Sequence, residues 1–185
     1  MNDRDFFFDK SVAIVGGADE WESEDADRCD IVAQVNSHWL RHLGRCDLLY
    51  TRQWLPCACV PSPRVYLDVH GPAPDRLWLL RKLRFLDFNI YNKPGPHGPD
   101  LAWCNVFCRE LNTMPLTGIM AIRHLTLQPI RSLYITGFTF YAENGKIPER
   151  RDSHDLRPQV EWLQNLLRTD LRVSVDETLK KLLEC

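Results

Sequence analysis

His154 is the residue of this sequence whose type and surroundings best suit proton transfer. It lies in the polar run Asp152-Ser153-His154-Asp155, just before a segment that predicts a helix. An imidazole titrates near neutral pH and can therefore serve as a general base. Tyr141 is a second candidate, because its phenol either fills the core or points into a cleft. Taken alone, His154 is more often a helix-capping or solvent-facing side chain, because most histidines are not catalytic.

Glycines follow two strand-like runs and could bring a ligand close to the main chain. Gly16 and Gly17 end the run Ser11–Val15, and Gly137 ends the run Ser132–Thr136. A glycine at the end of a strand lets the backbone bend and lets a phosphate or ribose approach it. Gly-Gly also marks plain turns, and the three-glycine dinucleotide fingerprint is absent.

Two further segments place polar groups beside elements that could hold a nucleotide. Asn36 follows an apolar run and offers both a donor and an acceptor, for a sugar or for capping the next helix. Thr117 and Gly118 stand at the start of an apolar helix, where a hydroxyl and backbone N–H groups can receive an anion. A normal helix cap is the structural alternative for Thr117 and Gly118.

The elements that must position these residues alternate between strands and helices. Apolar runs typical of strands buried on both faces occupy six places, Ser11–Val15, Asp30–Val35, Asp47–Tyr50, Arg64–Val69, Ser132–Thr136 and Leu171–Val175. Amphipathic runs predict helices over Asp75–Leu86, Thr117–Leu127 and Leu156–Leu167, and Asp176 opens a last helix. The pattern predicts one α/β domain over residues 1–185, a Rossmann-like three-layer sandwich with a mostly parallel sheet.

Composition narrows the function classes. The net charge is −2, which argues against a dominant basic field for nucleic acid, although Arg76, Arg81, Lys82 and Arg84 could form a local patch. No apolar run approaches the roughly 20 residues that span a bilayer, and the acidic N-terminus is unlike a signal peptide, so we expect a cytoplasmic protein.

Metal ligation is not expected. The seven cysteines suit free thiols in a reducing compartment. Cys57-Ala-Cys59 and Cys104-x-x-x-Cys108 miss the usual zinc spacing, and His38 with His42 has no third ligand in view. The acidic pair Asp25 and Asp27 is interpreted as facing solvent.

Taken in order, these pieces resemble the sialyltransferases. The segment from Val12 to Asp47, with Gly16-Gly17, Asn36 and Gly44-Arg45-Cys46-Asp47, is similar to the large sialylmotif of that family. Pro115–Ala121 with Leu133–Tyr141 is similar to its small motif, and His154-Asp155 with Glu161 to its terminal histidine motif. The layout is shared by the animal and bacterial types, and this chain is short and resembles a compact bacterial or phage version.

The resemblance implies a metal-independent, inverting transfer of a sialic-acid-like sugar from a CMP-sugar to an acceptor hydroxyl. Gly16, Gly17 and Asn36 would line the cytidine and phosphate site. Thr117 and Gly118 would cradle phosphate or ribose, and Gly137 would let the nucleotide approach the sheet. Tyr141 would hydrogen-bond the departing phosphate, and His154 would deprotonate the acceptor.

Two other functions remain open at this stage. One is a phage-type glycosyltransferase acting on hydroxymethylated pyrimidines in DNA, which should bind duplex DNA with a steep salt dependence. The other is a nucleotide- or glycan-binding module without catalysis.

Overall fold

A parallel sheet forms the centre of the protein in the computed structural model, which describes residues 3–18, 23–35, 45–51, 64–67, 101–151 and 154–184. Within these residues, six strands form one sheet in the order β4-β3-β2-β1-β5-β8, and every neighbouring pair is parallel. The strands are β1 (Ser11–Val15), β2 (Ile31–Val35), β3 (Leu48–Thr51), β4 (Arg64–Leu67), β5 (Ser132–Thr136) and β8 (Val173–Val175). The predicted α/β class with a mostly parallel sheet is confirmed.

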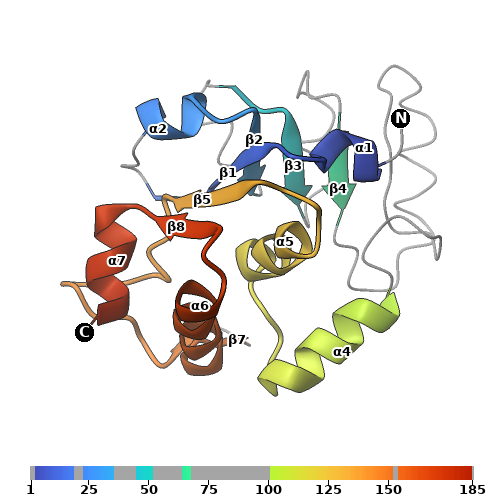
Figure 1. Cartoon of the computed structure of the whole chain (residues 1–185). Helices are drawn as coiled ribbons and strands as arrows, with labels where there is room; N and C mark the ends of the chain where they lie inside the picture. The colour runs from blue at the N-terminus through green and yellow to red at the C-terminus, as the bar shows by residue number, and fades with distance from the viewer. Residues whose placement is uncertain are drawn as a thin grey trace, which may run out of the picture.

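Helices cover both faces of this sheet (Figure 1). They are α1 (Asp3–Phe7), α2 (Ser23–Asp27), α4 (Leu101–Leu111), α5 (Thr117–Thr126), α6 (Arg157–Thr169) and α7 (Glu177–Glu184). In Figure 1, α2 lies on one side of the sheet, and α4, α5 and α6 lie on the other. A small antiparallel pair, β6 (Arg150–Arg151) and β7 (His154–Asp155), precedes α6.

The strand order reverses direction between β1 and β5. From β1 the chain moves outward to β2, β3 and β4, and it then returns to β5 on the other side of β1. In the register of this pair, Val15 at the end of β1 lies beside Thr136 at the end of β5. Ligands of open parallel sheets bind at such a reversal, outside the carboxyl ends of the strands. The topology therefore directs attention to the loops after Val15 and Thr136.

Alternating residues of β1 serve two separate cores. Val12 and Ile14 belong to the larger cluster, which also contains side chains of α4, α5, α6 and α7. Ala13 and Val15 belong to a smaller cluster with Ala26 of α2. These four side chains are almost completely buried, which explains why Val12–Val15 is a continuous apolar run.

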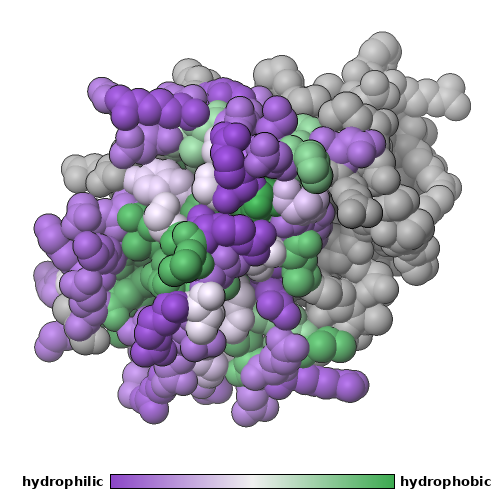
Figure 2. Space-filling view, in the orientation of Figure 1, coloured by the Kyte–Doolittle hydropathy of each residue, from purple (hydrophilic) through white to green (hydrophobic). Residues whose placement is uncertain are grey.

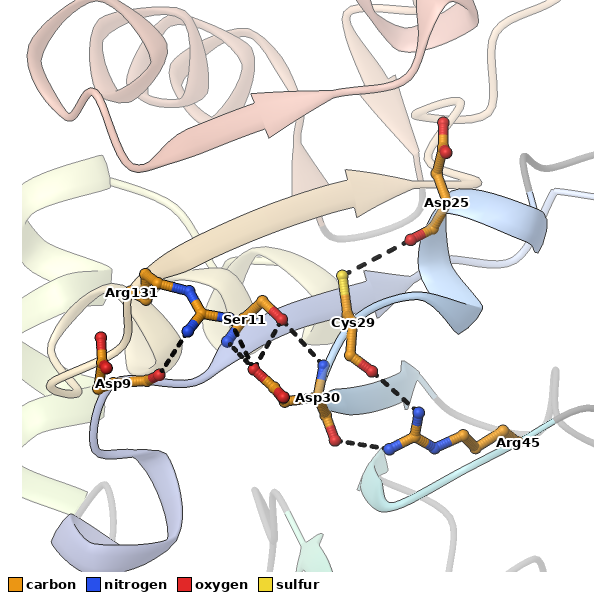
Figure 3. Close-up of polar contacts among 7 residues, drawn as sticks. All are labelled: Asp9, Ser11, Asp25, Cys29, Asp30, Arg45 and Arg131. Atoms are coloured by element: carbon orange, nitrogen blue, oxygen red, sulfur yellow. Dashed lines mark hydrogen bonds and ion pairs between the residues drawn. The ribbon is translucent and has the colours of Figure 1, made fainter.

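A polar network fixes the amino ends of the strands, at the edge opposite the reversal point (Figure 3). Ser11 donates its backbone N–H and its hydroxyl to one Asp30 oxygen, at 2.8 and 2.9 Å, and Arg131 donates to the same oxygen at 2.9 Å. The hydrogen bond from the Ser11 backbone is the main reason that the pKa of Asp30 lies below its ordinary value, and the bond from the Ser11 hydroxyl is the next. Arg45 donates to the carbonyls of Cys29 and Asp30. Arg45 therefore has a structural role, because it ties the turn between α2 and β2 to the segment that precedes β3.

The predicted elements compare closely with the structure where it is described. The runs Ser11–Val15 and Ser132–Thr136 are strands with those bounds, and the helix predicted over Thr117–Leu127 ends one residue earlier. The sequence interpretation missed α1, α2, α4 and the β6–β7 pair. The helix predicted over Asp75–Leu86 lies outside the described residues. Among the described helices, none has the length and apolar character to span a membrane.

Candidate functional site

A cavity of about 320 Å³ opens where β1 and β5 end. Its walls come from the loops after these strands, from the start of α5 and from the β6–β7 pair. Seven of the eight residues predicted for the site line this cavity, namely Gly16, Gly17, Thr117, Gly118, Gly137, Tyr141 and His154. The eighth, Asn36, lies outside the described residues. The structure therefore brings together residues that are far apart in the sequence.

The tips of β1 and β5 touch directly at Gly16. Its N–H donates to the Thr136 carbonyl at 2.8 Å, and the Ala18 N–H donates to the Gly137 carbonyl at 3.0 Å. A Cβ atom on Gly16 would lie 2.3 Å from the Gly137 carbonyl oxygen. The space that a side chain would need at Gly16 is therefore filled by the protein itself. Strand packing, rather than a ligand, accounts for glycine at this position.

Asp176 fixes the turn that follows β5. Its carboxylate is buried and accepts hydrogen bonds from the Thr136 hydroxyl and the Gly137 N–H, both at 2.8 Å. It also accepts from the Leu179 N–H at 2.6 Å and so caps α7. Gly137 adopts a φ of 71°, a conformation that favours glycine. The sequence predicted that Asp176 opens a helix, but not that it would bind Gly137, which lines the cavity.

The N-terminus of α5 forms one wall of the cavity. Leu116 is the N-cap residue and Thr117 the first helical residue, so the expected cap role of Thr117 is wrong by one position. The side chain of Leu116 makes no capping hydrogen bond to the first turn of the helix. The first backbone N–H groups of a helix have no partner within it and attract anions. A Cβ on Gly118 would come within 2.3 Å of the Phe138 ring, which explains the glycine there.

His154 enters the cavity with a defined tautomer. Its Nδ1 lies 2.7 Å from the carbonyl oxygen of Met114. A carbonyl oxygen only accepts hydrogen bonds, so Nδ1 must carry the proton. In the neutral imidazole, Nε2 then has an unshared electron pair and can accept a proton. The contact with Met114 thus leaves Nε2 as the nitrogen that can act as a general base.

Gln159, which was not predicted, links the segment containing His154 to the start of α5. It is fully buried, and its Oε1 accepts from the Leu116 N–H at 2.8 Å. Its Nε2 donates to the Asp155 carbonyl at 2.7 Å and to the Met114 carbonyl at 3.4 Å. Gln159 therefore holds in place the carbonyl that orients His154. Gln159 lies between Asp155 and Glu161 of the predicted histidine motif, and a glutamine in an amphipathic helix gave no local signal of this role.

Tyr141 lines the cavity from a strained loop. Phe140 and Tyr141 both have left-handed backbones, with φ of 48° and 58°. Left-handed geometry costs a residue with a side chain roughly 1–2 kcal/mol. Burial of the Phe140 ring in the main core compensates for part of that cost, whereas Tyr141 is 48% exposed. Strain of this kind persists only where the surrounding packing maintains it, and it is typical of functional sites.

Other candidates lie elsewhere. Asp25 and Asp27 are exposed, as expected, and His124 is buried in the core with its Nδ1 2.7 Å from the Tyr50 hydroxyl. In the parts of the chain that are described, no three His, Cys, Asp or Glu side chains are grouped to hold a metal. His38, His42, Cys57, Cys59 and the basic residues Arg76, Arg81, Lys82 and Arg84 lie outside the described residues.

A second hollow of about 550 Å³ lies between α6, β8 and α7. Its lining includes Leu167, Val175 and Leu183, and Figure 2 shows apolar surface on this side of the molecule among mostly hydrophilic side chains. None of the residues predicted for the site lines it. The cavity at the ends of β1 and β5 is therefore the better candidate for chemistry.

Comparison with known proteins identifies a similar fold. No protein-family model matches this chain, and no curated protein matches it by sequence. Among solved structures, the chain is similar to the sialyltransferase CstII from Campylobacter jejuni, solved in complex with a substrate analogue, CMP-3FNeuAc. The TM-score is 0.50 and the identity 13%, over 90% of this chain and 78% of that one. The likeness establishes that this chain has a distant sialyltransferase-like fold.

Proposed function

We propose that this protein is a glycosyltransferase that moves a sialic-acid-like sugar from a CMP-sugar to an acceptor hydroxyl, inverting the anomeric centre without a metal ion. The observation that carries the proposal is the cavity at the ends of β1 and β5. It combines a histidine of base-competent tautomer, a helix N-terminus whose N-cap residue Leu116 makes no side-chain capping bond, and a phenol. The sialyltransferase-like fold supports the same reaction class.

The leaving group of this reaction is an anion that must be stabilised. As the bond from the sugar to the CMP phosphate breaks, its electron pair stays with the phosphate oxygen. The first residues of α5 line the cavity, as do Thr117 and Tyr141, whose side chains carry hydroxyls. Hydrogen-bond donors held in place before the reaction stabilise developing charge most effectively. We assign the phosphate of the donor to this wall.

The acceptor hydroxyl needs a base as it attacks. Nε2 of His154 takes its proton while the acceptor oxygen forms a bond to the anomeric carbon. Because the oxygen approaches opposite the departing CMP, a single displacement inverts the configuration. The imidazolium that forms keeps its Nδ1–H on the Met114 carbonyl, 2.7 Å away. A general base of this kind commonly contributes about 10²–10⁴-fold to the rate.

The proposal is tested with the full chain, a panel of CMP-, UDP- and GDP-sugars, and hydroxylated acceptors, with products identified by mass spectrometry. Transfer from a CMP-sugar is expected. The His154→Ala variant should lose about 10²–10⁴-fold in kcat while it keeps its affinity for CMP. Glu24→Gln, at an exposed position on α2, is the control and should keep full activity.

Two outcomes would contradict the proposal. Tight CMP binding without transfer to any acceptor, and without slow hydrolysis of the donor, would make the protein a binding module. Unchanged turnover in His154→Ala would remove this residue from the mechanism.

A further inference from the structure

We propose that Asp176 is a positioning residue for the sugar donor, because it selects the one conformation of the turn after β5 in which the cavity binds CMP. This inference rests on the proposed function, since it assigns a further residue to the same site. Asp176 is not among the residues that line the cavity, so it acts on the donor through the main chain of Gly137. The sequence interpretation used Asp176 only as the start of a helix.

Gly137 makes the turn after β5 possible but does not determine its shape. Its φ of 71° is a conformation that residues with a side chain rarely adopt. Glycine, however, populates positive and negative φ about equally, so a turn with glycine at this position has several conformations open to it. A contact from outside the turn must therefore select the observed one.

The carboxylate of Asp176 supplies this contact. One of its oxygens accepts hydrogen bonds from the Gly137 N–H and from the Thr136 hydroxyl, both at 2.8 Å. Asp176 is only 4% exposed, and hydrogen bonds to an ionised group are about twice as strong as those between neutral groups. Its own N–H donates to the Ile135 carbonyl at 3.0 Å, which fixes Asp176 beside β5. A single buried anion thus holds both the end of β5 and the turn.

The turn that Asp176 holds is in contact with the other walls of the cavity. The Gly137 carbonyl accepts from the N–H of Ala18, in the loop after β1, at 3.0 Å. The ring of Phe138, the next residue, lines the cavity and packs against Gly118 at the start of α5, within 2.3 Å of the place where a Cβ would lie. A change in the backbone of Gly137 would therefore displace the wall to which the donor phosphate is assigned.

Loss of the carboxylate should weaken donor binding more than it slows the chemical step. The turn would then sample several conformations, and the apparent CMP Kd rises as the fraction with the correct one falls. Restricting the backbone of one residue is worth about 5–30-fold in an equilibrium constant. A saturating donor orders the turn again and leaves the contact between His154 and Met114 unchanged. The expected pattern is opposite to that of His154→Ala, which loses kcat and keeps its affinity for CMP.

Two substitutions separate this role from the capping of α7. Asp176 also accepts from the Leu179 N–H at 2.6 Å, as an N-cap residue does. Serine caps helices about as well as aspartate but has one side-chain oxygen, so Asp176→Ser keeps the cap and loses the bond to Gly137. Asp176→Ala loses both. Gln164→Leu is the matched control, because Gln164 donates to the Leu183 carbonyl and so holds the opposite end of α7.

Wild type and the three variants are each measured for CMP Kd, donor KM and kcat, at a temperature where tryptophan fluorescence shows the protein to be folded. Asp176→Ser and Asp176→Ala should raise CMP Kd and donor KM by about 5–30-fold, with kcat at saturating donor within about threefold of wild type. Asp176→Ser should have the higher Tm of the two, because it keeps the cap. Gln164→Leu should lower Tm but leave CMP Kd within about twofold of wild type.

Three results would overturn the inference. They are CMP binding by Asp176→Ser within about twofold of wild type, an equal loss of CMP affinity in Gln164→Leu, and a fall in kcat with CMP Kd unchanged. The second result would mean that the packing of α7 as a whole supports the cavity. Should one Asp176 variant fail to fold, the other decides. CMP binding that both variants leave unchanged refutes this inference alone, whereas absence of CMP binding by wild type refutes the proposed function and this inference with it.

Discussion

Replacing Gly16 with alanine tests the geometry of the site most severely, because the new methyl group meets backbone atoms. The added Cβ would lie 2.3 Å from the Gly137 oxygen and 2.8 Å from the Gly137 carbonyl carbon. Comfortable contacts between heavy atoms are roughly 3.5 Å, so the tips of β1 and β5 must separate by about 1 Å. The two hydrogen bonds that join these tips, at 2.8 and 3.0 Å, would then be stretched or lost.

The expected cost follows from these contacts. Each hydrogen bond contributes about 1 kcal/mol net, and overpacking a well-packed region costs about 1–3 kcal/mol. Gly16→Ala should therefore lower the free energy of unfolding by about 3–5 kcal/mol. For a protein of this size, that corresponds to a decrease in Tm of about 10 °C. Urea titration followed by tryptophan fluorescence measures the change.

Gly118→Ala is the matched comparison. Its Cβ would meet the ring of Phe138, a half-buried side chain that can rotate, rather than a backbone carbonyl. We expect a smaller loss, about 1–2 kcal/mol. If Gly16→Ala stays within about 1 kcal/mol of wild type, or costs less than Gly118→Ala, the described contact between the strand tips is wrong.

Two further predictions concern stability and positioning. Burial lowers the pKa of His124 to about 4, from an ordinary value of 6.5. As pH falls from about 6.5 to 4, the unfolded chain takes up a proton that the folded chain excludes, so stability should fall by about 3 kcal/mol. Urea midpoints across this range should fall less steeply in His124→Gln, and equal slopes would contradict the assignment. In Gln159→Glu, a carboxylate oxygen would face the carbonyl that now accepts at 2.7 Å. We expect kcat to drop about tenfold. An unchanged kcat would mean that Gln159 does not orient His154.

The parallel sheet could be predicted from the sequence because its central strands are buried on both faces. β1 contains four almost completely buried apolar residues in succession, and such a continuous run is typical of a strand in a parallel sheet. The resemblance to sialyltransferases implied that Gly16, Gly137 and Thr117 meet at one site, and all three line the same cavity. The strand order that brings the carboxyl ends of β1 and β5 together was not predicted. The helix α5 was predicted to within one residue.

Short elements and tertiary contacts could not be predicted. α2 has five residues, and β6 and β7 have two each, too few for a hydrophobic period to emerge. The partner of His154 Nδ1 is a main-chain carbonyl 40 residues earlier, and any residue type supplies a carbonyl. Gly16 was interpreted as leaving room for a ligand. In the structure that space is filled by Gly137, and this contact could not be predicted because it depends on the register of β1 against β5.

The central claim is that the cavity at the ends of β1 and β5 receives the CMP portion of a sugar donor. Its most direct test is a titration of the isotopically labelled full chain with CMP, followed through backbone amide signals in NMR spectra. We predict saturable shifts that are largest for Thr117, Gly118 and Gly137, with little change in α7. Absence of shifts at millimolar CMP, or shifts concentrated around the hollow between α6 and α7, would contradict the account.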